Sequence, residues 1–243
     1  LELMQDSAAA GGLIARAANR FLGKSDREAA SVMSSAQRHT HFLDSPRIVA
    51  ATARSDFQFS TLRHDLTSIF LVLPPNRLDA YSRWLRLLVA QALQDIARDA
   101  EAAQAAAARL KQPALFLLDE FAALGRLEAV ERAMGLMAGY GLQLWPILQD
   151  MSQLKDLYGA RANTFVANAG VLQTFGVNDF ETAKWLSQSM GKETIGYQTE
   201  SHRPGDIATT TQHIAARDLM TPDEIMQIDP AVQLLRVHGK PVI

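Results

Sequence analysis

Hydrophobic residues recur at helical spacing over the first 43 residues, which predicts small helices and no strand in this part of the chain. Residues 8–22 place six of them on one face: Leu13, Ile14, Ala17, Ala18, Phe21 and Leu22. The sequence Gly23-Lys24-Ser25 interrupts the pattern, and residues 26–43 resume it. We therefore expect two helices joined by a short turn.

A short apolar run follows at residues 69–73 and ends at Pro74-Pro75. A run of this length, bounded by proline, is typical of a fully buried strand in a parallel sheet. The next segment predicts a long helix with an apolar stripe made of Leu78, Tyr81, Leu85, Leu88, Val89, Ala92, Leu93 and Ile96. The alanine-rich residues 99–110 extend this helix.

Four further apolar segments predict strands, at residues 114–118, 142–150, 170–177 and 231–243. A helix over residues 126–138 is expected between the first two of them. Because strands alternate with helices along the chain, we predict an α/β fold built on a parallel sheet.

Capping signals mark two later helices. Asn178 with Glu181 forms a capping box for the first, which Gly191 ends, and Thr221 with Glu224 caps the second. Residues 199–218 are polar and lack a clear period, so they predict either a long loop or a hairpin.

Composition narrows the classes of protein. The 243 residues are 48% hydrophobic, enough for a large core, and their net charge of −2 is not that of a dedicated nucleic-acid wrapper. The chain has no cysteine, which excludes disulfides and thiolate metal sites. No apolar run reaches the roughly 20 residues that span a bilayer. Since the chain does not begin with Met, we expect it to be a piece of a longer protein.

The most informative chemistry lies where the second strand ends. Asp119 and Glu120 follow the apolar residues 114–118, and ligands of open parallel sheets collect at the carboxyl ends of strands. There the first carboxylate can hold Mg²⁺, often through water, and the second can take a proton from an attacking water. This is a Walker B arrangement, and an ordinary strand end that carries Asp-Glu is the alternative.

Gln149 ends the next strand, which we expect to neighbour the strand of Asp119. At that position its amide can hydrogen-bond a γ-phosphate or the attacking water, as a sensor residue does. A capping or turn residue is the alternative interpretation of Gln149 by itself.

The sequence around Asp119, Glu120 and Gln149 resembles that of the type IV secretion coupling proteins, the TraG-like family of conjugative DNA pumps. The resemblance runs through SIFLVLPPNRLDAYSRWLRLL, LLDEFAALGRLEAVERAMGLMAGYGLQLWPILQDMSQLKDLYG, NTFVANAGVLQTFGVNDFETAKWLSQSMGKETI and LMTPDEIMQID. It covers most of residues 45–243. Residues 1–45 are similar to the small all-α domain of that family, though less sharply.

The resemblance implies a three-layer P-loop NTPase fold of the RecA-like class. The chain would be its C-terminal portion, without the Walker A half and the membrane anchor, so that the parallel sheet is incomplete. Residues 1–45 would be a helical segment of the all-α domain, and residues 46–243 the C-terminal part of the NTPase domain.

The resemblance also implies a function. Family members are hexameric ATPases, anchored at the cytoplasmic face of the bacterial inner membrane, that use ATP and Mg²⁺. They receive single-stranded DNA bound to a relaxase, or protein effectors, and pass them to the proteins of a type IV secretion channel. On the matching motif positions, Asp119 would hold Mg-ATP through water, Glu120 would be the general base and Gln149 the sensor.

The sequence departs from the family in the arginine finger, a cation that a neighbouring subunit supplies to the γ-phosphate. Some relatives carry it near the end of the helix after Walker B, where this chain reads MGLMAGYG. Arg126, Arg132 and Arg161 are candidates by proximity in sequence alone.

The segment AANRFLGKSD matches a permissive phosphate-loop motif. However, no strand precedes it, and Ala18 falls in the middle of a predicted helix. We expect a turn between two helices, with Ser25 or Asp26 capping the second. With a Walker B pair and no convincing Walker A, the chain alone should be a poor ATPase. The alternatives are a non-hydrolysing recruitment fragment and another RecA-like DNA translocase.

Overall fold

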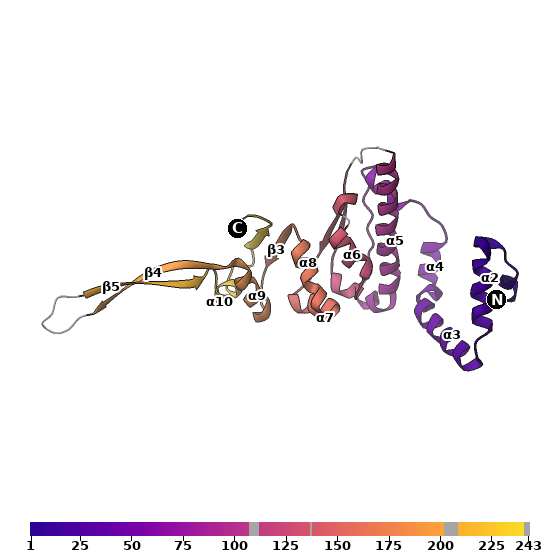
Figure 1. Cartoon of the computed structure of the whole chain (residues 1–243), viewed down its shortest axis with the longest axis horizontal. Coiled ribbons are helices and arrows are strands. Elements are labelled where there is room, and N and C mark those ends of the chain that lie inside the picture. Colours follow the sequence, from indigo (N-terminus) through magenta and orange to yellow (C-terminus); the bar gives the residue numbers. More distant parts are fainter. Residues whose placement is uncertain (107–111, 137, 202–208, 241–243) are drawn as a thin grey trace. The chain divides into compact units, whose positions relative to one another are not determined.

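A computed structural model of the chain describes residues 1–106, 112–136, 138–201 and 209–240. The chain divides into two compact units, coloured along the sequence in Figure 1. The first consists of Leu1–Gln58 with Phe70–Leu87, and the second of Phe59–Ile69 with Leu88–Ile243. The division at residues 45 and 46, drawn from the sequence, stays a prediction.

The first unit is helical, as its periodicity predicts. Its helices before α5 are α1 (Glu2–Gln5), α2 (Ala9–Leu22), α3 (Asp26–Thr40) and α4 (Pro46–Thr52), with 3₁₀ turns at His41–Asp44 and Pro75–Arg77. The turn between α2 and α3 is the expected one, because the Ser25 hydroxyl accepts from the Glu28 backbone N–H at 3.4 Å. The Glu28 carboxylate accepts from the Ser25 N–H at 3.3 Å, which completes a capping box.

The strand expected at residues 69–73 is wrong for this structure. These residues are not in a strand, and the side chains of Phe70 and Val72 are exposed. A strand needs hydrogen bonds from a neighbouring strand, and none of the described strands pairs with this segment. Its apolar pattern alone could not supply that neighbour.

The long helix α5 (Leu78–Ala105) follows the predicted stripe. Its buried residues repeat at helical spacing and are Val89, Ala92, Leu93, Ile96 and Ala100. The last part of the alanine-rich extension, residues 107–110, lies outside the described residues.

Strands β1 (Ala114–Leu118) and β2 (Leu142–Pro146) pair in parallel, in a register that runs from Ala114 opposite Leu142 to Leu118 opposite Pro146. Between them lie a 3₁₀ turn (Phe121–Leu124), α6 (Glu128–Leu136) and a second 3₁₀ turn (Ala138–Tyr140). The expectation that these two strands are neighbours is therefore confirmed.

Two helices that the sequence analysis did not assign follow β2. They are α7 (Met151–Tyr158) and α8 (Ala162–Asn168), joined by a 3₁₀ turn at Gly159–Arg161. Tyr158 and Phe165 are buried, with ring centroids 4.5 Å apart, and Phe121 from the turn after β1 lies 6.0 and 5.9 Å from them. This aromatic cluster fixes the segment after β1 against α7 and α8.

The remaining strands do not extend the parallel pair among the described residues. Strand β3 (Val171–Phe175) pairs antiparallel with β6 (Gln233–Val237), and α9 (Phe180–Met190) and α10 (Pro222–Met226) pack beside them around Ala183, Leu186 and Ile225. The α/β class is confirmed, but one parallel sheet through all the predicted strands is not what these residues form. The partner of β3 comes from the C-terminal segment, and this long-range pairing decides its direction.

Caps of the last two helices agree with the sequence at one position and differ at the other. Thr221 and Glu224 form the expected capping box at α10. At α9 the cap is Asp179 and not Asn178, because the Asp179 carboxylate accepts from the Thr182 N–H at 2.7 Å. Hydrogen bonds from Thr182 lower the pKa of Asp179.

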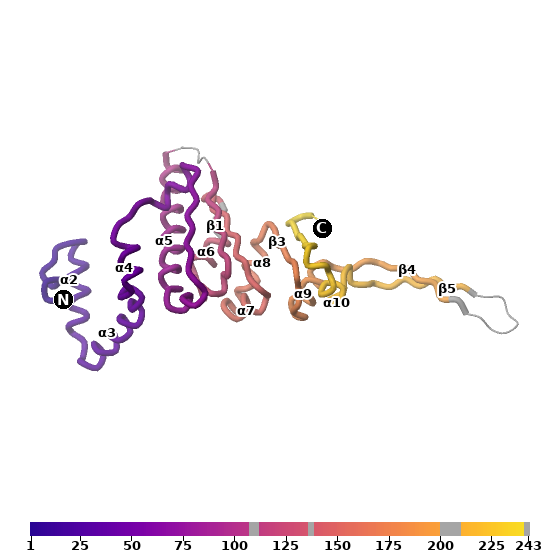
Figure 2. Tube along the Cα trace, turned by 180° about the vertical axis from the view of Figure 1, so that it is seen from behind, coloured from indigo at the N-terminus to yellow at the C-terminus, as the bar shows by residue number. Residues whose placement is uncertain are grey.

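The polar segment after α9 is a hairpin. Strand β4 (Lys192–Ser201) pairs antiparallel with β5 (Thr209–Asp218), so the ladder begins earlier than residue 199, and residues 202–208 lie outside the described residues. Figure 2 follows the two strands beside each other along their length. Among the described residues, no helix combines the length and hydropathy needed to cross a membrane.

Candidate functional site

The carboxyl ends of β1 and β2 are joined beyond the strands themselves. The Ile147 N–H donates to the Leu118 carbonyl at 3.0 Å, and the Phe121 N–H donates to the Ile147 carbonyl at 3.0 Å. Asp119 and Glu120 lie between these two bonds. The acidic pair is therefore held directly beside the segment that leads to Gln149.

Glu120 and Gln149 are in contact. The Gln149 Nε2 donates to the two carboxylate oxygens of Glu120, at 3.1 Å to Oε1 and 3.4 Å to Oε2. Both side chains are exposed, so a ligand can reach them. Two residues 29 positions apart thus meet at one edge of the parallel pair, as the expected order of strands requires.

Glu120 has an unusual backbone. Its φ of 48° and ψ of 49° lie in the left-handed region, which is uncommon for a residue with a side chain. The Asp119 Oδ1 accepts the Glu120 N–H at 3.1 Å and stabilises this turn. Backbone conformations of this kind concentrate at functional sites, which makes Glu120 a candidate for one.

The turn that carries the acidic pair is anchored at its far end. Phe121 is fully buried in the aromatic cluster, and the Tyr158 hydroxyl accepts the Leu127 N–H at 3.1 Å. The segment from Asp119 to Leu127 is therefore fixed at both ends, although its acidic side chains are exposed. A rigid support of this kind keeps a catalytic side chain in one position.

Gln149 is supported from the other side by the start of α7. Its backbone N–H donates to the Gln153 side chain at 3.0 Å, and the Asp150 carboxylate caps the helix by accepting the Gln153 N–H at 2.9 Å. Hydrogen bonds from the Ser152 hydroxyl and the Gln153 N–H lower the pKa of Asp150. This cap was not among the features predicted above, although an Asp followed three residues later by Gln, as in Asp150 and Gln153, is a known start signal of a helix.

Two of the three candidate arginines share one partner. The Arg161 guanidinium lies 2.8 Å from the Glu131 Oε1, and the Arg126 guanidinium lies 3.8 Å from its Oε2. Arg132 is exposed on α6, and the ion pairs found among the described residues do not include it. These contacts do not identify an arginine finger.

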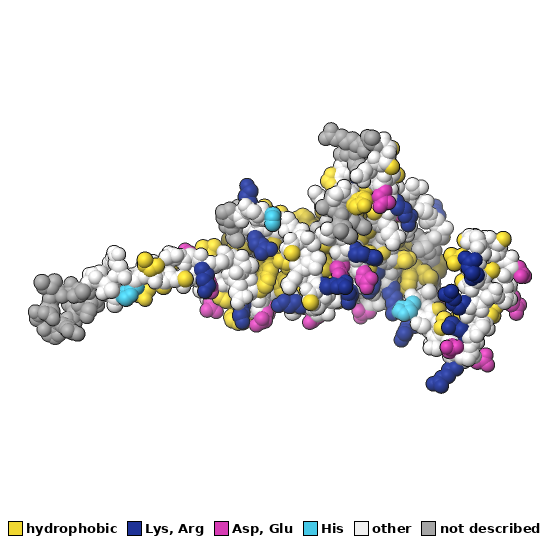
Figure 3. All heavy atoms as spheres, in the orientation of Figure 1, with side chains coloured by type: hydrophobic (Ala, Val, Ile, Leu, Met, Phe, Trp, Pro, Cys, Tyr) yellow, Lys and Arg dark blue, Asp and Glu magenta, His cyan; other side chains and the backbone are white. Residues whose placement is uncertain are grey.

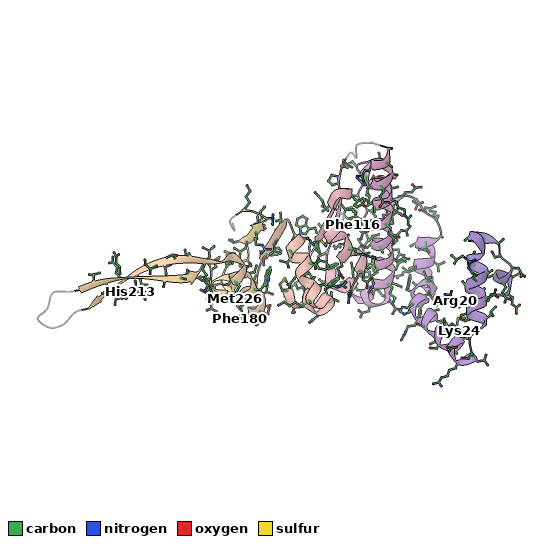
Figure 4. All side chains as sticks on the ribbon, viewed as in Figure 1. Arg20, Lys24, Phe116, Phe180, His213 and Met226 are labelled. Atoms are coloured by element: carbon green, nitrogen blue, oxygen red, sulfur yellow. The ribbon has the colours of Figure 1, made fainter. Side chains whose placement is uncertain are left out.

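The segment FLGKSD is a turn and does not form a phosphate loop. Ala18 is buried within α2, and Lys24 lies in the turn between α2 and α3 (Figure 4). The residues described before Gly23 are helical or irregular and contain no strand. The expected helix–helix turn is thus confirmed, and of the two candidate caps, Ser25 and Asp26, it is Ser25 that caps α3.

Asp119, at the carboxyl end of β1, suits a metal ion that is already coordinated by the phosphates of a nucleotide and by water. Among the described residues no group of three His, Asp or Glu side chains gathers to hold an ion. Mg²⁺ in nucleotide sites needs only one or two carboxylates, because phosphates and water fill its other positions. A single carboxylate from Asp119 fits that role.

The fold is similar to that of solved coupling proteins. An unbound form of the bacterial conjugative coupling protein TrwBdeltaN70 superposes with a TM-score of 0.69 at 20% identity, over 90% of this chain and 50% of that one. The plasmid coupling protein TrwB in complex with ADP and Mg²⁺ gives a TM-score of 0.64, again at 20% identity and over 90% and 49% of the chains. The described residues therefore have part of a RecA-like α/β fold, with an acidic pair at the carboxyl end of β1.

The chain belongs to the family described as type IV secretory system conjugative DNA transfer, whose sequence profile matches residues 10–243. Protein VirD4 of Rhizobium radiobacter is 31% identical over 199 residues, which is 81% of this chain and 28% of VirD4. Conjugal transfer protein TraG of Escherichia coli is 31% identical over 229 residues, 88% of this chain and 36% of TraG. The chain thus spans about a third of the length of these relatives.

Proposed function

We propose that this chain is part of a coupling ATPase that drives substrate transfer through a type IV secretion channel. The observation that carries the proposal is the contact between Glu120 and Gln149 beside Asp119 at the carboxyl edge of β1 and β2. Family membership supports the same conclusion, because the relatives are conjugal transfer and coupling proteins by name.

In this proposal each of the three residues has one role. Asp119 holds Mg²⁺ through water, and the ion supplies charge neutralisation on the phosphates when Mg-ATP is bound. Glu120 accepts the proton of the attacking water, and Gln149 orients that water or senses the γ-phosphate. The Gln149 amide already donates to the Glu120 carboxylate, so a water that lies between them would contact an acceptor and a donor together.

The substrate and partners follow from the family. We propose that the complete protein forms a homo-hexamer at the cytoplasmic face of the inner membrane. It would receive single-stranded DNA with a bound relaxase, or protein effectors, and engage the channel proteins. The similarity to VirD4 and TraG supports this assignment over that of a chromosome-segregation translocase.

The test is Glu120→Gln in the complete protein. The substitution keeps the hydrogen-bonding shape and removes the base, so ATP binding should remain while turnover falls by about 10²–10⁴-fold. Gln173→Glu, an exposed change on β3, is the matched control and should leave both unchanged. Turnover within a factor of two of the parent protein in Glu120→Gln would exclude Glu120 as the base.

We also propose that this chain alone does not hydrolyse ATP, since FLGKSD is a helix–helix turn. Calorimetric titration with Mg-ATP should show no binding that depends on Lys24, and Lys24→Ala should behave as the parent chain does. Binding that Lys24→Ala abolishes would contradict this assignment of the turn.

A further inference from the structure

A hydrogen bond joins the starts of helices α7 and α9, close to the candidate site. The backbone N–H of Met151, the first residue of α7, donates to the Thr182 hydroxyl of α9 at 3.2 Å. The N–H groups in the first turn of a helix have no partner within the helix itself. A side chain 31 positions away in the sequence therefore satisfies one of them at the start of α7.

Thr182 is held in place for this contact. It is 7% exposed, and its backbone N–H donates to the Asp179 carboxylate at 2.7 Å. Hydrogen bonds from the Thr182 hydroxyl and backbone N–H lower the pKa of Asp179. Because the hydroxyl gives its proton to this carboxylate, the lone pairs of its oxygen are directed to other donors, and the Met151 N–H is one of them.

Helix α9 is itself fixed on its buried face. Ala183 and Leu186 pack with Ile225 of α10 in one hydrophobic cluster. The Ser187 hydroxyl, which belongs to a residue only 1% exposed, donates to the Met220 carbonyl at 2.6 Å. These contacts make α9 a firm support for the first turn of α7.

The surface over α7 and α9 carries charges of both signs. Figure 3 shows acidic and basic side chains beside one another in this region. The caps Asp150 and Asp179 lie close enough for their charges to repel each other, and Lys155 attracts Asp179. Charge pairs near the surface contribute little to stability. The hydrogen bond from Met151 to the buried Thr182 is therefore the more specific link between the two helices.

This link lies close to Gln149 in the chain. Only Asp150 separates Met151 from Gln149, and the Gln149 N–H donates to the Gln153 side chain in the first turn of α7 at 3.0 Å. A shift of this turn would move Gln149 and change its 3.1 Å hydrogen bond to Glu120. A misplacement of about 1 Å can cost on the order of 10²-fold in the rate of an enzyme.

We propose that Thr182 is a positioning residue for Gln149. It acts by holding the first turn of α7 against α9, and not by contact with the nucleotide. Its effect on turnover rests on the proposed function, whereas its effect on the position of α7 does not.

Two substitutions separate the hydroxyl of Thr182 from its shape. Thr182→Val keeps the branched side chain without the hydroxyl, and in the complete protein it should lower kcat for ATP by about 10-fold while KM stays within a factor of two. Thr182→Ser keeps the hydroxyl and should restore kcat to within a factor of two of the parent protein. Thr199→Val, an exposed change on β4, is the matched control and should leave kcat unchanged. A kcat of Thr182→Val within a factor of two of the parent value would overturn the proposal.

A double variant distinguishes positioning from a general structural effect. If Thr182 acts through Gln149, Thr182→Val should not lower kcat further in a protein that already carries Gln149→Ala, because residues that act as a unit have non-additive effects. A fall of equal size in both backgrounds would show that Thr182 does not act through Gln149, and would also overturn the proposal.

Hydrogen exchange of the Met151 N–H, followed by NMR in this chain, needs no hydrolysis. Exchange in the first turn of α7 should be about 3- to 10-fold faster in Thr182→Val, as expected for the loss of one hydrogen bond, and Thr182→Ser should restore the parent rate. A rise of equal size throughout the chain would show a general loss of stability and overturn the proposal.

The exchange measurement also separates this proposal from the proposed function. Normal hydrolysis of ATP by the complete protein, together with unchanged exchange at Met151 in Thr182→Val, would exclude the positioning role and leave the ATPase assignment intact. Faster exchange confined to the first turn of α7, with a complete protein that does not hydrolyse ATP, would support the contact between α7 and α9 and contradict the ATPase assignment.

Discussion

At the scale of single residues, Glu120 has both a strained backbone conformation and a side-chain hydrogen bond to the distant residue Gln149. Its left-handed backbone costs on the order of 1–2 kcal/mol relative to an ordinary conformation. The Asp119 side chain and the buried Phe121 hold the chain in that conformation on either side. Its carboxylate reaches Gln149 from there, so the strained turn is part of how the site is assembled.

Gln149→Ala tests the sensor role at this scale. Without the amide, the complete protein should bind Mg-ATP within about three-fold of the parent affinity, while kcat falls by about 10-fold or more, as expected for an interaction made in the transition state. Steady-state kinetics together with nucleotide titration separates the two effects. An unchanged kcat would reduce Gln149 to a residue of the turn between β2 and α7.

At the scale of elements, helix α7 depends on the Asp150 cap. Asp150 accepts from the Ser152 hydroxyl and the Gln153 N–H, and these hydrogen bonds lower the pKa of its carboxyl group below the usual value for aspartate. A carboxyl group whose pKa is lowered in the folded state stabilises the fold above its unfolded pKa of about 3.9. That contribution is lost as the pH falls through the lower, folded-state value.

Two variants of Asp150 measure this cap by urea unfolding. Asp150→Ala should lower the free energy of unfolding by about 0.5–2 kcal/mol at pH 7. Asp150→Asn keeps a capping side chain without a titrating carboxyl, so its free energy of unfolding should fall less than that of the parent chain between pH 5 and pH 3, by about 0.5–1 kcal/mol. Identical pH profiles for the parent chain and Asp150→Asn would exclude the role of the carboxylate.

At the scale of the whole molecule, the two faces of the β1–β2 pair differ in coverage. Ala114 and Leu118 are buried on one face, whereas Leu115, Leu117 and Trp145 are exposed on the other. Parallel sheets normally have both faces covered. The uncovered face therefore contributes little to the stability of this chain by itself.

The matched pair Leu117→Ala and Leu118→Ala measures that difference. Leu118 is 8% exposed and Leu117 is 55% exposed, although both are leucines of the same strand. Leu118→Ala should lower the free energy of unfolding by about 2–4 kcal/mol and Leu117→Ala by less than about 1 kcal/mol. Similar losses for the two variants would mean that the Leu117 face is covered in solution.

The sequence by itself determined the features that depend on neighbouring residues. Thr221 caps α10 as predicted, and Ser25, one of two predicted candidates with Asp26, caps α3, because a capping box needs only side chains three positions apart. The acidic pair could also be located from the sequence, because Asp119 and Glu120 directly follow the short apolar run at residues 114–118. One cap was assigned to the wrong residue, since Asp179 and not the adjacent Asn178 caps α9.

Tertiary structure alone decided the features that need partners far away in the chain. The direction of β3 depends on β6, about 60 residues away, and the segment 69–73 is no strand because no described strand pairs with it. The meeting of Glu120 with Gln149 required β1 and β2 to lie side by side, and the left-handed turn at Glu120 leaves no mark in local pattern. Hydrogen bonds between strands are made at long range, so patterns of apolar residues can propose them but cannot assign their partners.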